Sequence, residues 1–335
     1  MNKVTTIGID LAKQVFQVSV LDRWGKQLSN KSMSRARLIE YLSQLPPTVI
    51  GMEACGTAHY WSGKLTAMGH TVKLFPPIYI NGLVYGNKTD VNDARAIALA
   101  ATQPVAPTVQ AKTPDQLTLQ GLLRVRERRI GQRTRCTNQI RGLLLEHGVV
   151  IAKGIRHVRQ LTLAGIPTVV EALLEELLCE FRLLDQLVNE SDKRVREQVQ
   201  SHPVGQRLLA IPGFGPVNVL ASLVVNPSDY RNGRHYAAWL GLVPRQSGTG
   251  GSIRLGGMSK RGNRYHRHLM CHGARAFLCV SKGKNDPLLQ WARRIQSRKG
   301  TPVAVGALAN KLSRISWKVM SGETYCVSKA VTTMN

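Results

Sequence analysis

The sequence predicts a chain of three parts: an α/β domain in residues 1–110, an α-helical domain in residues 111–200 and a mainly α-helical domain in residues 201–335. Three observations predict this organisation. Strand-like and helix-like segments alternate through the first part. Leucines recur at three- and four-residue intervals through the second part. The third part opens with two apolar segments separated by a Pro-Gly-Phe-Gly turn, and it then becomes strongly basic.

β-Branched residues and polar–apolar alternation mark the strands of the first part, whereas leucines at helical spacing, such as Leu38, Leu42 and Leu45, mark a helix. Strands are expected at residues 3–10, 15–22, 26–32, 47–54 and 70–75, and helices at residues 34–45, 59–69 and 90–101. Three strands followed by β-α-β units predict a mixed sheet with helices on its faces.

The second part follows a linker, because residues 102–114 contain three prolines. Residues 115–148 and 168–199 carry leucines at helical spacing, which predicts two long antiparallel helices or a coiled coil. The first of these segments is rich in arginine, including Arg124 and Arg128, so one of its faces is expected to be basic.

The third part begins with a helix, a tight turn and a second helix over residues 208–224. This pattern is similar to a helix-hairpin-helix, whose glycine turn can present backbone N–H groups to a phosphate. An ordinary tight turn between two helices explains the pattern equally well. Downstream, Asp286 is the only acidic residue between positions 253 and 320.

The overall charge restricts the class of partner. The chain has 46 Lys and Arg against 20 Asp and Glu, a formal net charge of +26. A polyanion is the usual partner of such a surplus, so nucleic acid is expected. An anionic membrane surface is the alternative, but neither a basic amphipathic anchor nor a membrane-spanning apolar run is present. Scattered cysteines and the lack of a signal-peptide pattern predict a reducing, cytoplasmic location.

Four carboxylates are the candidate chemical centre. Asp10 and Glu53 come at the ends of predicted strands, and Asp90 and Asp93 share one face of a predicted helix. Such residues can converge at one edge of a sheet, where their mutual repulsion calls for a hard divalent cation such as Mg²⁺. Two such ions about 4 Å apart can clamp a phosphodiester. The alternative is that Asp10 and Asp90 merely cap helices.

A glycine-rich loop near residue 250 is the second informative segment. Its hydroxyl groups and cations suit phosphate binding, or a nucleophile that attacks phosphorus while arginine neutralises the charge. A flexible basic loop that only grips backbone phosphates is the alternative. The residues concerned are Ser247, Thr249, Ser252, Arg245, Arg254, Lys260 and Arg261.

His266, His268, Cys271 and His272 have helical spacings that suit zinc, but no clear fourth ligand accompanies them, so a zinc site is not expected. Trp239 is expected to lie in a hydrophobic core, with base stacking as the alternative.

Motifs from one end of the chain to the other resemble the DEDD transposases of bacterial insertion sequences. They occur in the family's order and read "IGIDLAK", "MEACGT", "NKTDVNDARAIA", "IPGFGP", "AAWLGLVPRQ" and "GGMSKRGNRYHRHLMCHGARA". Together these motifs are highly specific, although any one alone is not. The resemblance implies that the chain is a serine-type recombinase guided by a bridge, or seeker, RNA.

The resemblance also implies a fold and a site. It predicts a RuvC-like, RNase H-like N-terminal domain, a coiled-coil middle and a C-terminal transposase domain. Asp10, Glu53, Asp90 and Asp93 would bind Mg²⁺. The family's nucleophilic serine corresponds to Thr249, with Ser247 two residues earlier as the other candidate.

The expected function is therefore a recombinase that moves its own element by a covalent hydroxyl–phosphate intermediate. The implied partners are double-stranded DNA, a structured guide RNA and further copies of the chain in a dimer or tetramer, in the bacterial cytoplasm at the nucleoid. Arg264 joins the residues expected to bind nucleic acid. The alternatives are a Mg²⁺-dependent RuvC-like nuclease or junction resolvase that uses water, and a non-catalytic DNA-binding protein.

Overall fold

The computed structural model describes residues 4–162, 166, 168–280 and 286–325. The chain divides into two compact units, Met1–Asp115 and Gln116–Asn335, with the division just inside a long helix. Each unit is considered by itself below. No helix among these residues combines the length and the hydrophobicity that crossing a membrane requires.

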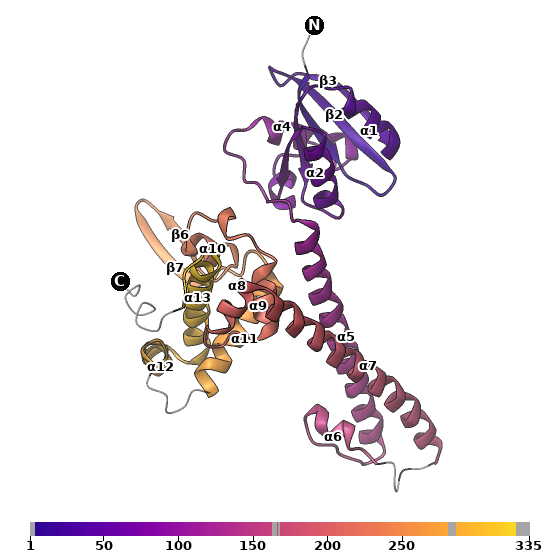
Figure 1. The fold of residues 1–335 in the computed structure, drawn as a ribbon, viewed down its shortest axis with the longest axis vertical. Coiled ribbons are helices and arrows are strands. Elements are labelled where there is room, and N and C mark those ends of the chain that lie inside the picture. The colour runs from indigo at the N-terminus through magenta and orange to yellow at the C-terminus, as the bar shows by residue number, and fades with distance from the viewer. Residues whose placement is uncertain (1–3, 163–165, 167, 281–285, 326–335) are drawn as a thin grey trace. The chain divides into compact units, whose positions relative to one another are not determined.

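The first unit is a mixed α/β domain, as the sequence predicts (Figure 1). All five expected strands and all three expected helices are present, and one short helix is added before the last of them. In chain order the elements are β1 (Val4–Asp10), β2 (Val15–Asp22), β3 (Gln27–Ser34), α1 (Arg35–Ser43), β4 (Val49–Glu53), α2 (Ala58–Ala67), β5 (Thr71–Phe75), α3 (Pro77–Asn81) and α4 (Asp90–Thr102).

The five strands form one mixed sheet in the order β3-β2-β1-β4-β5. β1, β2 and β3 pair antiparallel, whereas β1, β4 and β5 run parallel and are joined through α1 and α2. The register pairs Gly8 with Gly51 and Ile9 with Met52. The carboxyl ends of the two central strands therefore finish side by side.

Alternate residues of β1 and β4 point to opposite faces of the sheet. Apolar residues on one face, such as Ile7, Ile9 and Met52, form a fully buried core with Leu38 of α1 and Trp61 of α2. Burial of this face fixes the strands' register, because a slip of one residue would expose the whole apolar set.

The opposite face of the sheet is flat at its centre because Gly8 and Gly51 have no side chains. Helix α4 fills this space with small residues, and its alanines between 94 and 101 are buried. A Cβ atom added to Gly8 would lie 2.3 Å from the carbonyl oxygen of Ala94 and 2.3 Å from the amide nitrogen of Ala98. The backbone of α4 therefore rests directly on the backbone of β1.

The second unit is mainly helical, with one β-hairpin. Its elements are α5 (Pro114–Glu146), α6 (Ile155–Arg159), α7 (Thr168–Ser201), α8 (Pro203–Leu209), α9 (Pro216–Leu223), η1 (Pro227–Asp229), α10 (Gly233–Trp239), β6 (Pro244–Thr249), β7 (Ser252–Met258), α11 (Arg264–Val280), α12 (Pro287–Lys299) and α13 (Thr301–Met320).

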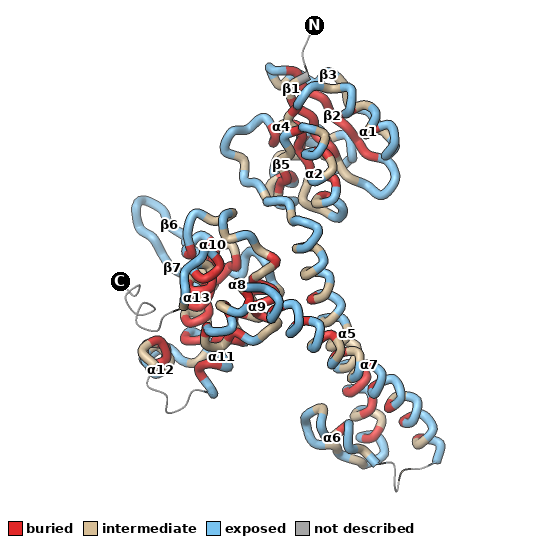
Figure 2. The backbone as a smooth tube through the Cα atoms, viewed as in Figure 1, coloured by how far each residue is buried: buried red, intermediate tan, exposed pale blue. Residues whose placement is uncertain are grey.

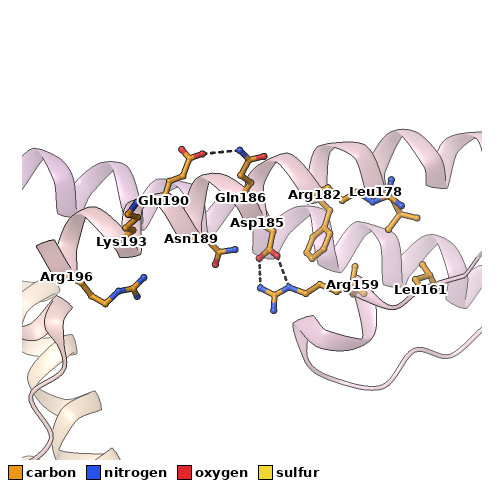
Figure 3. A pocket seen from close by; sticks show the side chains of 12 residues that line it. Arg159, Leu161, Leu178, Arg182, Asp185, Gln186, Asn189, Glu190, Lys193 and Arg196 are labelled. Atoms are coloured by element: carbon orange, nitrogen blue, oxygen red, sulfur yellow. Dashed lines mark hydrogen bonds and ion pairs between the residues drawn. The ribbon is translucent and has the colours of Figure 1, made fainter.

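Helices α5 and α7 lie antiparallel, and ion pairs accompany the apolar contacts between them. Asp185 of α7 accepts hydrogen bonds from Arg159 of α6 at 2.7 and 2.8 Å (Figure 3). It also accepts one from Arg133 of α5 at 2.6 Å. Hydrogen bonding to Arg159 is the main reason that the pKa of Asp185 lies below its ordinary value. Arg126 pairs with Asp192 in the same interface. Part of the arginine-rich segment therefore joins two helices instead of forming an open basic face.

The remaining helices form a core around α13, which contacts α8, α10, α11 and α12. The expected helix-turn-helix is present as α8 and α9. Its turn packs closely, since a Cβ atom added to Gly213 would lie 2.4 Å from the carbonyl oxygen of Gly273 in α11. In contrast, both strands of the β6–β7 hairpin are almost wholly exposed (Figure 2).

The contact between α4 and β1 gives a stability prediction. Gly8→Ala forces two backbones apart, so we expect it to lower the unfolding free energy of the protein by about 3 kcal/mol. Urea unfolding followed by circular dichroism measures this. Gly63→Ala is the matched control, because an added Cβ there meets nothing within 4 Å and alanine is the better helix former. Equal midpoints for the two variants would contradict the close packing.

Candidate functional site

The same short pattern, a glycine, an apolar residue and an acid, ends two neighbouring strands. It places both acids on the face of the sheet that α4 covers. Gly8-Ile9-Asp10 ends β1, and Gly51-Met52-Glu53 ends the neighbouring parallel strand β4. Asp10 alternates with Gly8, and Glu53 with Gly51, so both carboxylates are expected on the face that α4 covers. Both residues are half-buried. The glycine lets the helix approach, and the acid two residues later meets its end.

Helix α4 supplies the other two acids from its first turn. Thr89 caps the helix by accepting a hydrogen bond from the backbone N–H of Asn92, so Asp90 is the first helical residue and not the cap. Asp90 is exposed, whereas Asp93 is half-buried. The Oδ1 atom of Asp93 is buried and has no hydrogen-bond partner.

A helix cap does not explain Asp10 either. Residues 11–14 form a loop before β2, so no helix begins at Leu11. The capping alternative for Asp10 and Asp90 is therefore wrong. The N-terminus of α4 lies beside the strand ends, so the positive end of its helix dipole stabilises the negative charge of the carboxylates there.

The four carboxylates act on one another electrostatically. Burial raises the pKa of Asp10 to about 6, and the charges of Asp90, Asp93 and Glu53 add to this rise. Burial also raises the pKa of Glu53, with Asp93 adding to the rise while the positive charge of Lys88 opposes it. The structure therefore brings together the four acids that the sequence singles out.

A chain of polar side chains ties the start of α4 to the sheet. Ser32 donates to Gln17 at 2.6 Å, Gln17 donates to Asn30 at 2.6 Å, and Asn30 donates to the carbonyl oxygen of Val91 at 2.9 Å. Gln17 stands opposite Asp10 in the β1–β2 register. The sequence analysis did not identify these positioning residues, because the sequence of a strand does not show which neighbours its polar side chains will contact.

Cys55 is a further neighbour that the sequence analysis did not assign to the site. Burial raises the pKa of its thiol, and the charges of Glu53 and Asp10 add to the rise. The thiol donates to the carbonyl oxygen of Gly56 at 3.4 Å. Cys55 is therefore held protonated beside the acids. In the sequence, the only indication that Cys55 belongs to the site was its position close after Glu53.

The donor set of this site suits a hard cation. All four acids offer oxygen ligands, their repulsion would be relieved by positive charge, and one buried carboxylate oxygen has no partner. Across the described residues, no group of three or more His, Cys, Asp or Glu side chains is arranged to hold a metal ion. Mg²⁺ does not require such a group, because it keeps several waters and takes one or two carboxylates.

The glycine-rich loop of the second unit is a β-hairpin. Gly250 and Gly251 form its two-residue turn with φ values of +57° and +80°, the left-handed pair that hairpin turns favour. Ser247 lies opposite Arg254, and Thr249 lies opposite Ser252. These four side chains therefore share one face of the ribbon.

The other predicted nucleic-acid contacts are also in the second unit. Arg245, Lys260, Arg261 and Arg264 are exposed around the hairpin and the start of α11. On α5, Arg128 is exposed, and the exposed Arg124 pairs with Glu127 at 3.4 Å. Arg254 lies on the exposed strand β7, where its guanidinium is accessible to a phosphate.

The histidine-rich helix α11 has a structural explanation. His266 is only 2% exposed, and its Nε2 atom lies 3.3 Å from the hydroxyl of Ser222. Burial lowers the pKa of His266 to about 3, so it is neutral in the folded protein. The rings of His268 and His272 contact each other 4.3 Å apart, and Trp239 packs against Tyr236.

An acidic site on an α/β unit and an exposed hydroxyl-bearing hairpin on a basic helical unit are features of enzymes that act on nucleic acids. A transposase family model, of the DEDD type, matches residues 7–149. A second model, described as the transposase family of insertion sequences IS116, IS110 and IS902, matches residues 205–286.

Whole-length relatives agree with these matches. The chain is 39% identical over 96% of its length to a probable family 20 transposase of Pseudomonas aeruginosa, covering 98% of that protein. It is 35% identical over 97% of its length to the transposase of IS1111A from Coxiella burnetii, covering 92% of it, and 34% identical over 97% to that of IS1328 from Yersinia enterocolitica, covering 99% of it.

The chain belongs to the IS116/IS110/IS902 family of insertion-sequence transposases, as its motifs predict. The chain is therefore a member of an enzyme class that acts on DNA, and its net positive charge agrees with a DNA substrate.

The acidic site gives a prediction for the protein without divalent ions. Folding raises the pKa of Asp10 from 3.8 to about 6, so the folded state holds a proton that the unfolded state releases. Stability is then lost as the pH rises from about 4 to 6, and the loss persists above pH 6. Asp10→Asn should raise the melting temperature at pH 7.5 but hardly at pH 4.

Added Mg²⁺ should restore this stability to the wild-type protein and have much less effect on Asp10→Asn. Differential scanning fluorimetry in EDTA and in excess Mg²⁺ measures both effects. Glu40→Gln, an exposed position on α1, is the matched control. Equal Mg²⁺ shifts in Asp10→Asn and Glu40→Gln would argue against a cation at the acids.

Proposed function

We propose that this transposase cuts and rejoins DNA through a covalent bond between a hairpin hydroxyl and a DNA phosphate. The observation that carries the proposal is the pairing of two chemistries in one chain. Four mutually repelling carboxylates gather at the end of a sheet, and the two candidate nucleophilic hydroxyls, those of Ser247 and Thr249, share an exposed face with Arg254. Water-dependent hydrolysis would need the first feature only.

The reaction would proceed in two balanced steps. The oxygen of Ser247 or Thr249 bonds to the scissile phosphorus, the hydroxyl proton passes to solvent, and a P–O bond of the DNA breaks to leave a free DNA hydroxyl. A DNA hydroxyl then attacks the protein–phosphate ester, which releases the side-chain hydroxyl and rejoins the strand. No net bond energy is lost in the exchange.

The carboxylates are assigned to bind Mg²⁺, which would supply positive charge to stabilise the phosphate as it gains negative charge. Asp10, Glu53 and Asp93 are half-buried and so are held in position, whereas Asp90 stands at the exposed start of α4. The sheet order, with an antiparallel half and a parallel half, supports a RuvC-like, RNase H-type fold for this unit. One copy of the chain or two would supply the acids and the hydroxyl.

The two hydroxyls differ in their surroundings. Ser247 lies directly across from Arg254, which can neutralise a bound phosphate. Thr249 lies next to the glycine turn and across from Ser252. The register favours neither by position alone, because both side chains are exposed on the same face.

Guide RNA is assigned as a partner on the family resemblance together with the basic surface. The exposed cations around the hairpin and on α5 would contact the backbones of RNA and duplex DNA, while base pairing would select the target. Assembly into a dimer or tetramer through the long helices α5 and α7 is part of the same proposal.

The nucleophile can be identified by separate alanine variants. We expect either Ser247→Ala or Thr249→Ala to lose covalent adduct and strand exchange by at least about a thousandfold, because the attacking atom is gone. A suicide DNA substrate traps the adduct, and mass spectrometry maps the modified residue. If Thr249 reacts, Thr249→Ser should keep activity.

Ser252→Ala is the matched control, since it removes an exposed hydroxyl from the opposite strand of the hairpin. Full strand exchange by both Ser247→Ala and Thr249→Ala would overturn the proposed covalent mechanism, and a Mg²⁺-dependent enzyme that uses water would become the alternative to test. Absence of DNA cleavage by the wild-type protein, together with unchanged DNA binding by Asp10→Asn, would instead favour a protein that only binds DNA.

The RNA partner has its own test. The full chain, purified from cells that carry its complete element, should retain one discrete element-encoded transcript after washing at moderate salt. Sequencing of the copurified RNA measures this. Recovery of cellular RNA in proportion to its abundance would count against a specific guide.

A further inference from the structure

A cavity of about 710 Å³ lies at the foot of the β6–β7 hairpin. Pro244 and Met258, from the bases of the two strands, form one wall, and helices α12 and α13 form the others. Neither the acidic site nor the proposed nucleophiles use this space. Its size falls within the ordinary range of small-molecule sites, which is about 300–1,000 Å³.

The lining combines an aromatic residue with clustered positive charge. Trp291 contributes an indole, while Lys299, Lys311 and Arg314 contribute three cations. None of the described residues that line the cavity is acidic. Lys311 is only 4% exposed, and burial followed by the charges of Arg314 and Lys318 lowers its pKa to about 8. A cavity so built attracts an anion that also carries a flat apolar surface.

We infer that this cavity binds a single DNA nucleotide lifted out of the base stack, with its base against Trp291 and its phosphate beside Lys299, Lys311 and Arg314. An aromatic side chain stacks on any base. The inference rests on the proposed function, because the hairpin that forms one wall also carries the hydroxyls assigned to attack DNA. A nucleotide held here would fix the strand beside the hairpin.

Holding a nucleotide outside the helix also explains how the hairpin could reach a phosphate. Extrusion costs a few kcal/mol of stacking and pairing, and the cost is smallest where the base is already unpaired. The cavity should therefore prefer an unpaired nucleotide over a paired one. It should also require the base itself, since an abasic site offers nothing to Trp291.

The preference can be measured with the full chain and simple probes. Three 20-base-pair DNA duplexes are compared by fluorescence anisotropy: fully paired, with one extra unpaired thymidine, and with one extra abasic nucleotide. We expect the thymidine bulge to bind about tenfold more tightly than the abasic bulge. In Trp291→Ala this ratio should fall to about one, whereas Trp291→Phe should keep most of it.

Filling the cavity gives a second variant. Ala307→Phe places a ring among the lining residues and should abolish the thymidine preference while general DNA affinity at low salt is kept. Ala172→Phe, at an exposed position on α7, is the matched control for the added ring. A thymidine preference that persists in a folded Ala307→Phe protein would overturn the inference.

A cross-link on the wild-type protein needs no variant. With 5-iodouracil in place of the unpaired thymine, ultraviolet light should join the base to Trp291 or Met258, as mapped by mass spectrometry. Cross-links only at other residues, or an equal preference for the same bulge in duplex RNA, would overturn the assignment to DNA. If the preference is absent while the hairpin still forms its covalent adduct, the cavity inference alone fails. If the adduct is absent while the preference is present, the proposed chemistry alone fails.

Discussion

The close contact between α4 and the glycines of the central strands is the constraint on which the acidic site depends. Gly8 and Gly51 are paired in register. The backbone of α4 lies where a side chain of Gly8 would be, and a Cβ atom added to Gly51 would lie 3.0 Å from the Cβ of Ala101 and from the carbonyl oxygen of Ile97. This contact sets how far the first turn of α4 lies from the ends of β1 and β4. Any larger residue at Gly8 would lift Asp90 and Asp93 away from Asp10 and Glu53, because backbone atoms, unlike side chains, cannot move aside.

The cluster of four carboxylates is electrostatically unfavourable for the folded state. In a chain of net charge +26, four carboxylates are kept together, and the positive charge of Lys88 opposes the rise in the pKa of Glu53. Burial and repulsion both disfavour the ionised forms of Asp10 and Glu53, whose pKa values are raised. The rest of the unit must offset this cost, and the polar chain from Ser32 to Val91 holds the helix end in place while it does so.

The positive charges serve two different purposes. Arg126 and Arg133 are partly buried between α5 and α7, where Asp192 and Asp185 accept their hydrogen bonds. Other cations remain exposed on the hairpin and at the start of α11. Net charge therefore indicates a nucleic-acid partner but does not count the residues that touch it. Around α13, Lys299, Lys311 and Arg314 line the open cavity beside Trp291, and none of the described residues that line it is acidic.

The sequence by itself determined the strands and helices of the first unit, the long helices of the second unit, the four acids and the family, because hydrophobic periodicity and short motifs are local properties. Only the tertiary structure decided that Thr89 caps α4 in place of Asp90, that Gln17, Asn30 and Cys55 adjoin the acids, and that part of the arginine-rich segment is turned inward. Arg254 and Ser252 were found on the same face as Ser247 and Thr249 only once the hairpin register was known. Contacts between residues distant in sequence depend on how elements pack, and no local pattern encodes them.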